Sequence, residues 1–380
     1  MLHCDHPGNS VTISPDGKFR ICCYGKELSS VKDQTIKEFF NSKEVAEIKN
    51  SLDSGVRHKY CNLCWQLEDT GLQSYRQIGL PFKAESDFPA QLDIKFNNIC
   101  NLACKMCDPV SSSKLATEWK QLGWMGDSVP YKDTNSMTIL PNWTSVDYQQ
   151  NKKYKIFDEI LDNISHIKRL KFTGGEPFMT KEILRFLKAI PYNNRKNIIL
   201  KFTTNGTQVM DDWNETLKSF KECNIGISCD GVAEVYDYIR YPNTWNEWLT
   251  SHKQITGNYK YHINCTVTIF NIFNLHRLTK WGMKNKILNK LNLGYDNIPL
   301  LYAPINLPKT AKEQAVESLH EAIDISTEYH WTRSLKHIAG HMLKNQINLW
   351  DHFVKVTKQQ DAHRKQSFVR VVPELTEYFG

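Results

Sequence analysis

Three cysteines lie close together after a short apolar run, and their spacing could hold an iron-sulfur cluster. Cys100, Cys104 and Cys107 form a C-x3-C-x2-C array in the segment NNICNLACKMCDP. Three thiolates on one loop can ligate three irons of a 4Fe-4S cluster, which normally takes four cysteines, so the fourth iron would stay open. An open metal position is where a substrate or cofactor binds. The alternative is a zinc knuckle completed by a distant residue.

A second set of cysteines lies nearer the N-terminus. Its members are Cys4, Cys22, Cys61 and Cys64. Alternating apolar residues around the turn at 15–17 predict a β-hairpin, on which Cys22 faces away from the apolar side and Cys23 shares it. We therefore interpret Cys22 as a ligand and Cys23 as core. Four thiolates from two elements suit a closed site, and their spacing alone leaves structural zinc and an iron-sulfur cluster equally open.

The composition agrees with metal ligation inside the cell. The chain has 380 residues, eleven cysteines and a formal charge of +7, without a block of basic residues. Neither a long apolar run nor a basic, apolar N-terminal signal is seen, so we expect a cytoplasmic protein that does not cross a membrane. Thiols stay reduced in the cytosol, which favours metal sites over disulfides. Cys223, Cys229 and Cys265 lie in apolar runs and are interpreted as buried thiols.

Short apolar runs alternate with helix-like segments along most of the chain. The runs span 92–96, 170–173, 198–203, 225–229, 262–269 and 298–302, and the helical segments 111–122, 154–166, 180–190 and 213–222. This order is typical of βαβ units and predicts an α/β fold, a partial (β/α)6 TIM-like barrel. Residues 124–143 are interpreted as an insertion that could act as a lid, and 309–329 and 340–360 as C-terminal helices.

A turn-rich segment at 79–89 divides the chain. We expect a small N-terminal α+β domain at 1–80, the partial barrel at 90–305 and a C-terminal helical region at 306–380.

Distinctive turns end the predicted strands. They read TGGEP at 173–177, TTNGT at 203–207 and SCDG at 228–231. Functional groups of βα barrels gather at the C-terminal ends of the strands, so these turns should surround the cysteine loop. Gly174 and Gly175 let the backbone approach a ligand closely, and Glu176 can accept hydrogen bonds from an ammonium group. An ordinary strand-to-helix turn is the alternative for this segment.

The cysteine loop followed in order by GGEP, TNG and S-x-D-G resembles the radical S-adenosylmethionine (radical SAM) enzymes, over roughly residues 91–302. The resemblance implies that the open iron binds the amino and carboxylate groups of the methionine moiety. It also implies that reductive cleavage yields a 5′-deoxyadenosyl radical, which abstracts a hydrogen atom from a substrate. A reductant such as flavodoxin or ferredoxin is implied as a partner.

The resemblance carries over residue by residue. Cys100, Cys104 and Cys107 would ligate the cluster, and Gly174, Gly175 and Glu176 would receive the methionine amino group. The remaining cofactor-binding candidates are Asn205, Ser228, Asp230, Arg240 and Met106. Ser228 and Asp230 would contact ribose or carboxylate, and Arg240 the carboxylate, because a guanidinium offers a bidentate fork. Met106 stands where the family usually has an aromatic residue, and its backbone would contact adenine.

The N-terminal set resembles another domain. The run C-x12-G-x4-C from Cys4 through Gly17 to Cys22 is similar to the start of the SPASM and twitch auxiliary-cluster domains, here placed before the barrel. The resemblance implies a second, fully ligated 4Fe-4S cluster, held by Cys4, Cys22, Cys61 and Cys64, that relays electrons or holds substrate. Residues 65–76 belong to the same pattern, and Glu68, Ser74 and Arg76 within it are interpreted as helix-surface residues.

The leading hypothesis is a radical SAM enzyme that abstracts hydrogen from a peptide or protein side chain. A nucleotide, sugar or RNA substrate is the first alternative, since the net charge is positive. A non-catalytic, zinc-dependent nucleic-acid-binding protein is the alternative from a different class.

Overall fold

A nine-stranded sheet organises the molecule in the computed structural model, which describes residues 3–69, 74–124, 130, 156–208, 210–295 and 298–380. The strands follow the order β3-β2-β1-β4-β5-β6-β7-β8-β9, so β3 and β9 lie at the two ends of an open sheet. All neighbours from β1 and β4 through to β9 are parallel, and β1, β2 and β3 are joined antiparallel. The predicted α/β class is confirmed.

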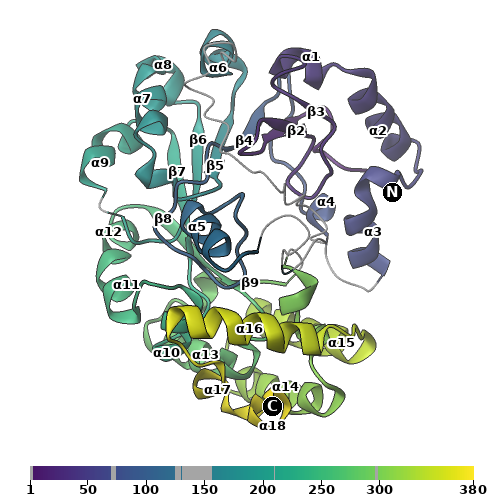
Figure 1. Ribbon diagram of the computed structural model, residues 1–380. Helices are drawn as coiled ribbons and strands as arrows, with labels where there is room; N and C mark the ends of the chain where they lie inside the picture. The colour runs from purple at the N-terminus through teal and green to yellow at the C-terminus, as the bar shows by residue number, and fades with distance from the viewer. Residues whose placement is uncertain (1–2, 70–73, 125–129, 131–155, 209, 296–297) are drawn as a thin grey trace.

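The parallel strands alternate with helices, as the sequence pattern predicts. The strands are β4 (Gln91–Lys95), β5 (Arg169–Thr173), β6 (Ile199–Thr204), β7 (Glu222–Ser228), β8 (Lys260–Thr266) and β9 (Leu291–Gly294). The helices between them are α5 (Ser113–Gln121), α6 (Ile156–Asp162), α7 (Lys181–Ala189), α8 (Tyr192–Arg195), α9 (Asp211–Lys218), α10 (Glu234–Ile239), α11 (Trp245–Ser251), α12 (Lys253–Thr256) and α13 (Leu275–Lys284). Figure 1 shows α7, α8 and α9 on the outer side of the curved sheet.

One face of the parallel strands is apolar and forms the core. Leu92, Leu170 and Leu200 are fully buried and occupy one row across three neighbouring strands. Phe172 and Phe202 stack in the next row, with ring centroids 5.3 Å apart. Successive side chains of a strand point to opposite faces, so the polar residues between these positions share the other face. The three cysteines predicted to be buried thiols, Cys223, Cys229 and Cys265, are indeed buried.

The N-terminal segment extends the same sheet. The predicted hairpin is present as β1 (Ser10–Ile13) and β2 (Lys18–Arg20), followed by β3 (Ser29–Ser30). β1 pairs in parallel with β4, with Ile13 opposite Ile94. The helices that complete this segment are α1 (Ile36–Phe40), α2 (Lys43–Asp53), α3 (Asn62–Asp69) and α4 (Tyr75–Ile78), which gather on the right in Figure 1.

The C-terminal region is helical, as predicted. It contains α14 (Lys309–Asp324), α15 (Tyr329–Lys344), α16 (Trp350–Arg364), α17 (Phe368–Val371) and α18 (Thr376–Phe379). Figure 1 shows α16 lying across the molecule beneath α5 and β9. No helix in the described ranges is both long and apolar enough to span a membrane.

Three expected elements differ from the structure. The sixth parallel strand is β9 rather than 298–302, where Leu300–Tyr302 forms a 3-10 helix after Pro299, which has no N–H for a strand ladder. The segment expected as one helix at 340–360 is divided between α15 and α16, because Asn345 has extended backbone. The helix expected to reach residue 222 ends at Lys218, and Glu222 already belongs to β7. The expected insertion at 124–143 lies outside the described residues, except Trp124 and Pro130.

Candidate iron-sulfur sites

The loop that follows β4 carries Cys100, Cys104 and Cys107 and is held by backbone hydrogen bonds to the turn after β5 and to the segment after α10. Gly175 N donates to Asn97 O at 2.9 Å, and Glu176 N donates to Ile99 O at 2.7 Å. Further along the loop, Ala103 N donates to Tyr241 O at 2.7 Å. The turn after β5 and the segment after α10 therefore fix the loop on both sides. The first of these lies at a strand C-terminus, where functional groups are expected.

The two glycines of the GGEP turn are required by this close approach. Gly174 has a φ of 106°, a region that side chains disfavour. A Cβ on Gly175 would lie 2.3 Å from the carbonyl oxygen of Ile99. The glycines thus let the turn pack directly against the cysteine loop. Their expected contact with a methionine amino group stays a prediction.

Glu176 is almost completely buried, and its carboxylate is occupied by the chain itself. Oε1 accepts from Thr204 Oγ1 at 2.7 Å, and Oε2 accepts from Asn205 N at 2.8 Å. Burial raises the pKa of this carboxyl to about 7, although these hydrogen bonds oppose the shift. Glu176 therefore links the end of β5 to the end of β6.

Two side chains direct hydrogen-bond donors at the cysteine sulfurs. Arg240 Nη1 donates to Cys104 Sγ at 3.5 Å, and Asn205 Nδ2 lies 3.9 Å from Cys100 Sγ. The backbone N of Leu102 also donates to Cys100 Sγ at 3.5 Å. Donors of this kind stabilise negative charge on sulfur, which a cluster-ligating thiolate carries. Arg240 and Asn205, both named from the sequence, thus lie next to the thiols.

The other residues predicted to bind the cofactor differ in whether their side chains are exposed or already hydrogen-bonded within the protein. Asp230 is fully buried, forms an ion pair with Arg240, and accepts from Thr266 N at 2.7 Å. Ser228, at the end of β7, and Met106, which packs against the core, are both partly exposed. Asp230 therefore positions Arg240, whereas Ser228 and Met106 keep accessible surface.

The sequence analysis did not predict the contact between the C-terminal helix α16 and the cysteine loop. Arg364 of α16 donates through Nη2 to Ala103 O at 2.6 Å, and its Nε donates to Glu118 Oε2 at 2.7 Å. Both Arg364 and Glu118 are buried. An arginine near the end of a polar helix gives no local signal of this contact, because its partner lies 261 positions earlier in the chain.

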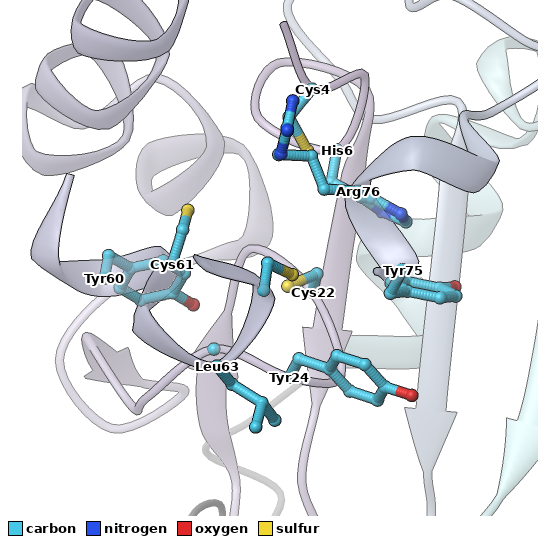
Figure 2. A pocket seen from close by; sticks show the side chains of 11 residues that line it. Cys4, His6, Cys22, Tyr24, Tyr60, Cys61, Leu63, Tyr75 and Arg76 are labelled. Atoms are coloured by element: carbon cyan, nitrogen blue, oxygen red, sulfur yellow. The ribbon is translucent and has the colours of Figure 1, made fainter. Parts of the chain in front are cut away.

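The N-terminal cysteines meet at one pocket. Cys4, Cys22, Cys61 and Cys64 all line it, and the pocket contains about 310 Å³ of empty space, part of it open to solvent. Figure 2 shows Cys4, Cys22 and Cys61 around this space, with Tyr24 and Tyr75 at its side. Cys23 does not line the pocket. The structure thus brings together the four thiols selected from the sequence.

Residues 74–76 have a different position from the expected one. Ser74 and Arg76 are buried rather than on the helix surface, and both bond to Glu68. Hydrogen bonds from Ser74 and the backbone of Arg76 act to lower the pKa of the Cys64 thiol, against the larger effect of burial. The surface interpretation was therefore wrong: these residues support Cys64. The buried guanidinium also lies 4.7 Å from the centre of the Trp65 ring.

Both cysteine sets fit a group that brings positive charge. Burial raises the pKa of Cys4 to about 11 and those of Cys61 and Cys100 to about 12, so these thiols stay protonated without a bound cation. Within the described ranges, no three His, Cys, Asp or Glu side chains converge on a point suited to a single metal ion. A four-iron cluster spreads its ligands over several metal atoms, so the two sets need no such point.

Comparisons with known proteins agree with both sets. Residues 94–279 match the model of the Radical SAM superfamily, and residues 4–65 match that of SPASM, an iron-sulfur cluster-binding domain. A search of curated proteins found no match. The two matches together imply 4Fe-4S clusters and S-adenosylmethionine as cofactors.

Solved structures with a similar arrangement share little sequence with the chain. Native anSMEcpe with bound AdoMet and Cp18Cys peptide is 17% identical, with a TM-score of 0.39 over 70% of this chain and 65% of that one. Streptococcus suis SuiB bound to S-adenosylmethionine is 15% identical, with a TM-score of 0.36 over 74% of this chain and 57% of that one. The chain thus spans less than two thirds of the length of either protein.

Proposed function

We propose that this chain, with its Radical SAM domain behind an iron-sulfur cluster-binding domain, abstracts hydrogen from a peptide or protein side chain. The observation that carries the proposal is the loop of Cys100, Cys104 and Cys107, held at the strand ends with donors directed at its sulfurs. A cluster bound there would supply the electron that cleaves S-adenosylmethionine, at an iron without a protein ligand.

The chain's own residues would bind and orient the cofactor. The backbone of Gly174 and Gly175 and the accessible Ser228 are the proposed contacts for S-adenosylmethionine, and the backbone of Met106 for its adenine. Glu176 and Asp230 are positioning residues, because their carboxylates are already hydrogen-bonded within the protein. Arg240 would contribute positive charge close to Cys104.

The N-terminal set would hold the auxiliary cluster through Cys4, Cys22, Cys61 and Cys64. A reductant such as flavodoxin or ferredoxin would supply electrons. The peptide substrate is inferred from the domain content, since relatives with such domains often act on peptides, and the solved SuiB structures include one bound to its precursor peptide SuiA.

Two cysteine variants test the assignment. Anaerobically reconstituted protein should contain about eight irons, as two four-iron clusters. Cys104→Ala should abolish 5′-deoxyadenosine formation from S-adenosylmethionine and a reductant, whereas Cys64→Ala should retain some cleavage and lose product. Cleavage at the wild-type rate by Cys104→Ala would contradict the site.

The substrate class is tested separately. Deuterated peptide and nucleoside libraries are offered to the enzyme, and deuterium is measured in 5′-deoxyadenosine. Label from peptides supports the proposal, and label from nucleosides or RNA alone would replace the peptide by the alternative substrate.

A further inference from the structure

The polar face of the sheet, opposite the apolar core, carries an excess of positive charge. Asp93, Lys171 and Lys201 lie directly across from one another on β4, β5 and β6. Lys95 lies two positions after Asp93 on β4, and Arg169 lies two positions before Lys171 on β5. Both therefore point to the same face as Asp93 and Lys171. We call these five residues the cationic face; it contains four cations and one carboxylate. Glu222 of β7 lies on the same side of the sheet, in the row of Arg169, but its carboxylate accepts from Lys260 Nζ at 2.7 Å.

The single carboxylate is already paired. Asp93 Oδ2 accepts from Lys171 Nζ at 2.6 Å, and the side chain of Asp93 is 4% exposed. Lys95 and Lys201 have no ion-pair or hydrogen-bond partner in the described part of the chain. Arg169 donates through Nη1 to the neutral Gln91, and its buried Nε has no partner there. Three cations of the face thus have no ion-pair partner among the described residues, although Asp93 and Asp108 act on Lys95, and Glu222 on Lys201 and Arg169, from beyond ion-pair distance.

This arrangement is unfavourable for the chain alone. Neighbouring strands lie about 4.8 Å apart, and like charges directly opposite each other, such as Lys171 and Lys201, destabilise a sheet. Burial and then the charges of Arg169 and Lys171 lower the pKa of Lys201. Burial and the charge of Arg20 lower that of Lys95. An anion placed beside Lys201 and Arg169 would relieve the repulsion between them.

The cationic face lies close to neighbours of both cysteine sets. Lys95 interacts electrostatically with Asp108, the neighbour of Cys107, and with Cys23, the neighbour of Cys22. Lys171 and Arg169 likewise act on His6, which lines the N-terminal pocket. A substrate on this face would therefore be within reach of groups next to both sets.

We propose that the cationic face binds the carboxylate of an acidic residue in a peptide substrate, with Lys201 and Arg169 as its ion partners. The proposal rests on the proposed function for the peptide and adds the charge of the residue that is recognised. A carboxylate fits better than a phosphate, because Asp93 remains on the same face and repels a dianion more strongly than a monoanion.

The test is binding, measured by fluorescence anisotropy with anaerobic, cluster-loaded protein. The probe is a dye-labelled peptide with several glutamates, and its matched control is the same peptide with glutamine at those positions. Lys201→Gln should weaken binding of the glutamate peptide about tenfold or more. Lys201→Arg keeps the positive charge and should bind the glutamate peptide as tightly as wild type does. Lys221→Gln, an exposed lysine just before β7, removes the same charge elsewhere and should bind like wild type.

Several outcomes would overturn the proposal. Equal binding of the glutamine peptide, or equal loss in Lys201→Gln and Lys221→Gln, would show that the face does not select carboxylates. Displacement of the peptide by inorganic phosphate far more readily than by free glutamate would reassign the face to phosphate. If Lys201→Gln does not fold, Arg169→Gln replaces it. The anisotropy experiment measures binding and does not need turnover. A failure of the proposed function, seen in the peptide-labelling experiment, can therefore be distinguished from a failure of carboxylate binding.

Discussion

Lys105 and Asp361 form a buried ion pair of 2.9 Å across 256 positions of sequence. Lys105 lies between two of the loop cysteines, and Asp361 lies in α16. Tyr238 OH also donates to Asp361, at 2.8 Å. The C-terminal helix is thereby fixed to the cysteine loop at a second point, next to Arg364.

Asp361→Asn should destabilise the protein by about 3–5 kcal/mol, because it leaves the Lys105 ammonium buried without its counter-ion. Denaturant unfolding under anaerobic conditions measures the loss of stability. Iron should be released first from the site of Cys100, Cys104 and Cys107. Glu321→Gln is the matched control, since its pair with Lys280 is about half exposed on both sides, and it should cost at most about 1 kcal/mol. Similar costs for the two variants would contradict the role of the buried pair.

Gly175→Ala should prevent assembly of an iron-sulfur cluster at Cys100, Cys104 and Cys107. The new Cβ would lie 2.3 Å from one backbone atom and 2.7 Å from another, and neither can move without displacing the cysteine loop. We expect iron content to fall to that of the N-terminal site alone. Gly340→Ala in α15 meets nothing within 4 Å and should stabilise the helix by about 0.5–1 kcal/mol. Full iron content in Gly175→Ala would show that the loop can yield.

Arg240→Met should make the barrel cluster harder to reduce. The guanidinium donates to Cys104 Sγ, and its loss removes both positive charge and a hydrogen bond from a ligating sulfur. The midpoint potential, measured by redox titration with EPR detection, should become more negative. Arg277→Met, which removes a partly exposed arginine paired with Glu234, should leave the potential unchanged. An unchanged potential in Arg240→Met would argue against contact with the cluster ligand.

Glu176→Gln should change how stability depends on pH. The folded-state pKa of Glu176 is raised from 4.5 to about 7, so the folded protein binds its proton more tightly than the unfolded chain. This contribution is complete below pH 4.5 and is lost as the pH rises through about 7. The free energy of unfolding of wild type minus that of Glu176→Gln should therefore fall by about 3 kcal/mol over this interval. A difference independent of pH would mean that the carboxyl titrates normally.

The sequence predicted most of what local patterns determine. Apolar runs located β4 to β8 because each buries alternate side chains, and cysteine spacing located both sets because their ligands come from short segments. β9 was misplaced because its four residues include only two leucines, and the run at 298–302 is more apolar.

Contacts between distant segments could not be read from these patterns. Ser74 and Arg76 look like helix-surface residues in sequence, and their burial depends on Glu68 and on the pocket beside them. The pairing of Arg240 with Asp230 likewise depends on how the turn after β7 folds back. These are tertiary contacts, and local patterns in a single sequence do not show which distant residues meet.

The parallel pairing of β1 with β4 also determines what happens to a shortened chain. Without the N-terminal segment, the four residues of β4 that pair with β1 would form an unprotected edge, with unpaired N–H and C=O groups beside Leu92 and Ile94. Edges of this kind recruit strands from other molecules and lead to aggregation. The N-terminal segment therefore also protects the edge of the sheet, and we expect the parallel sheet to aggregate when it is expressed without this segment.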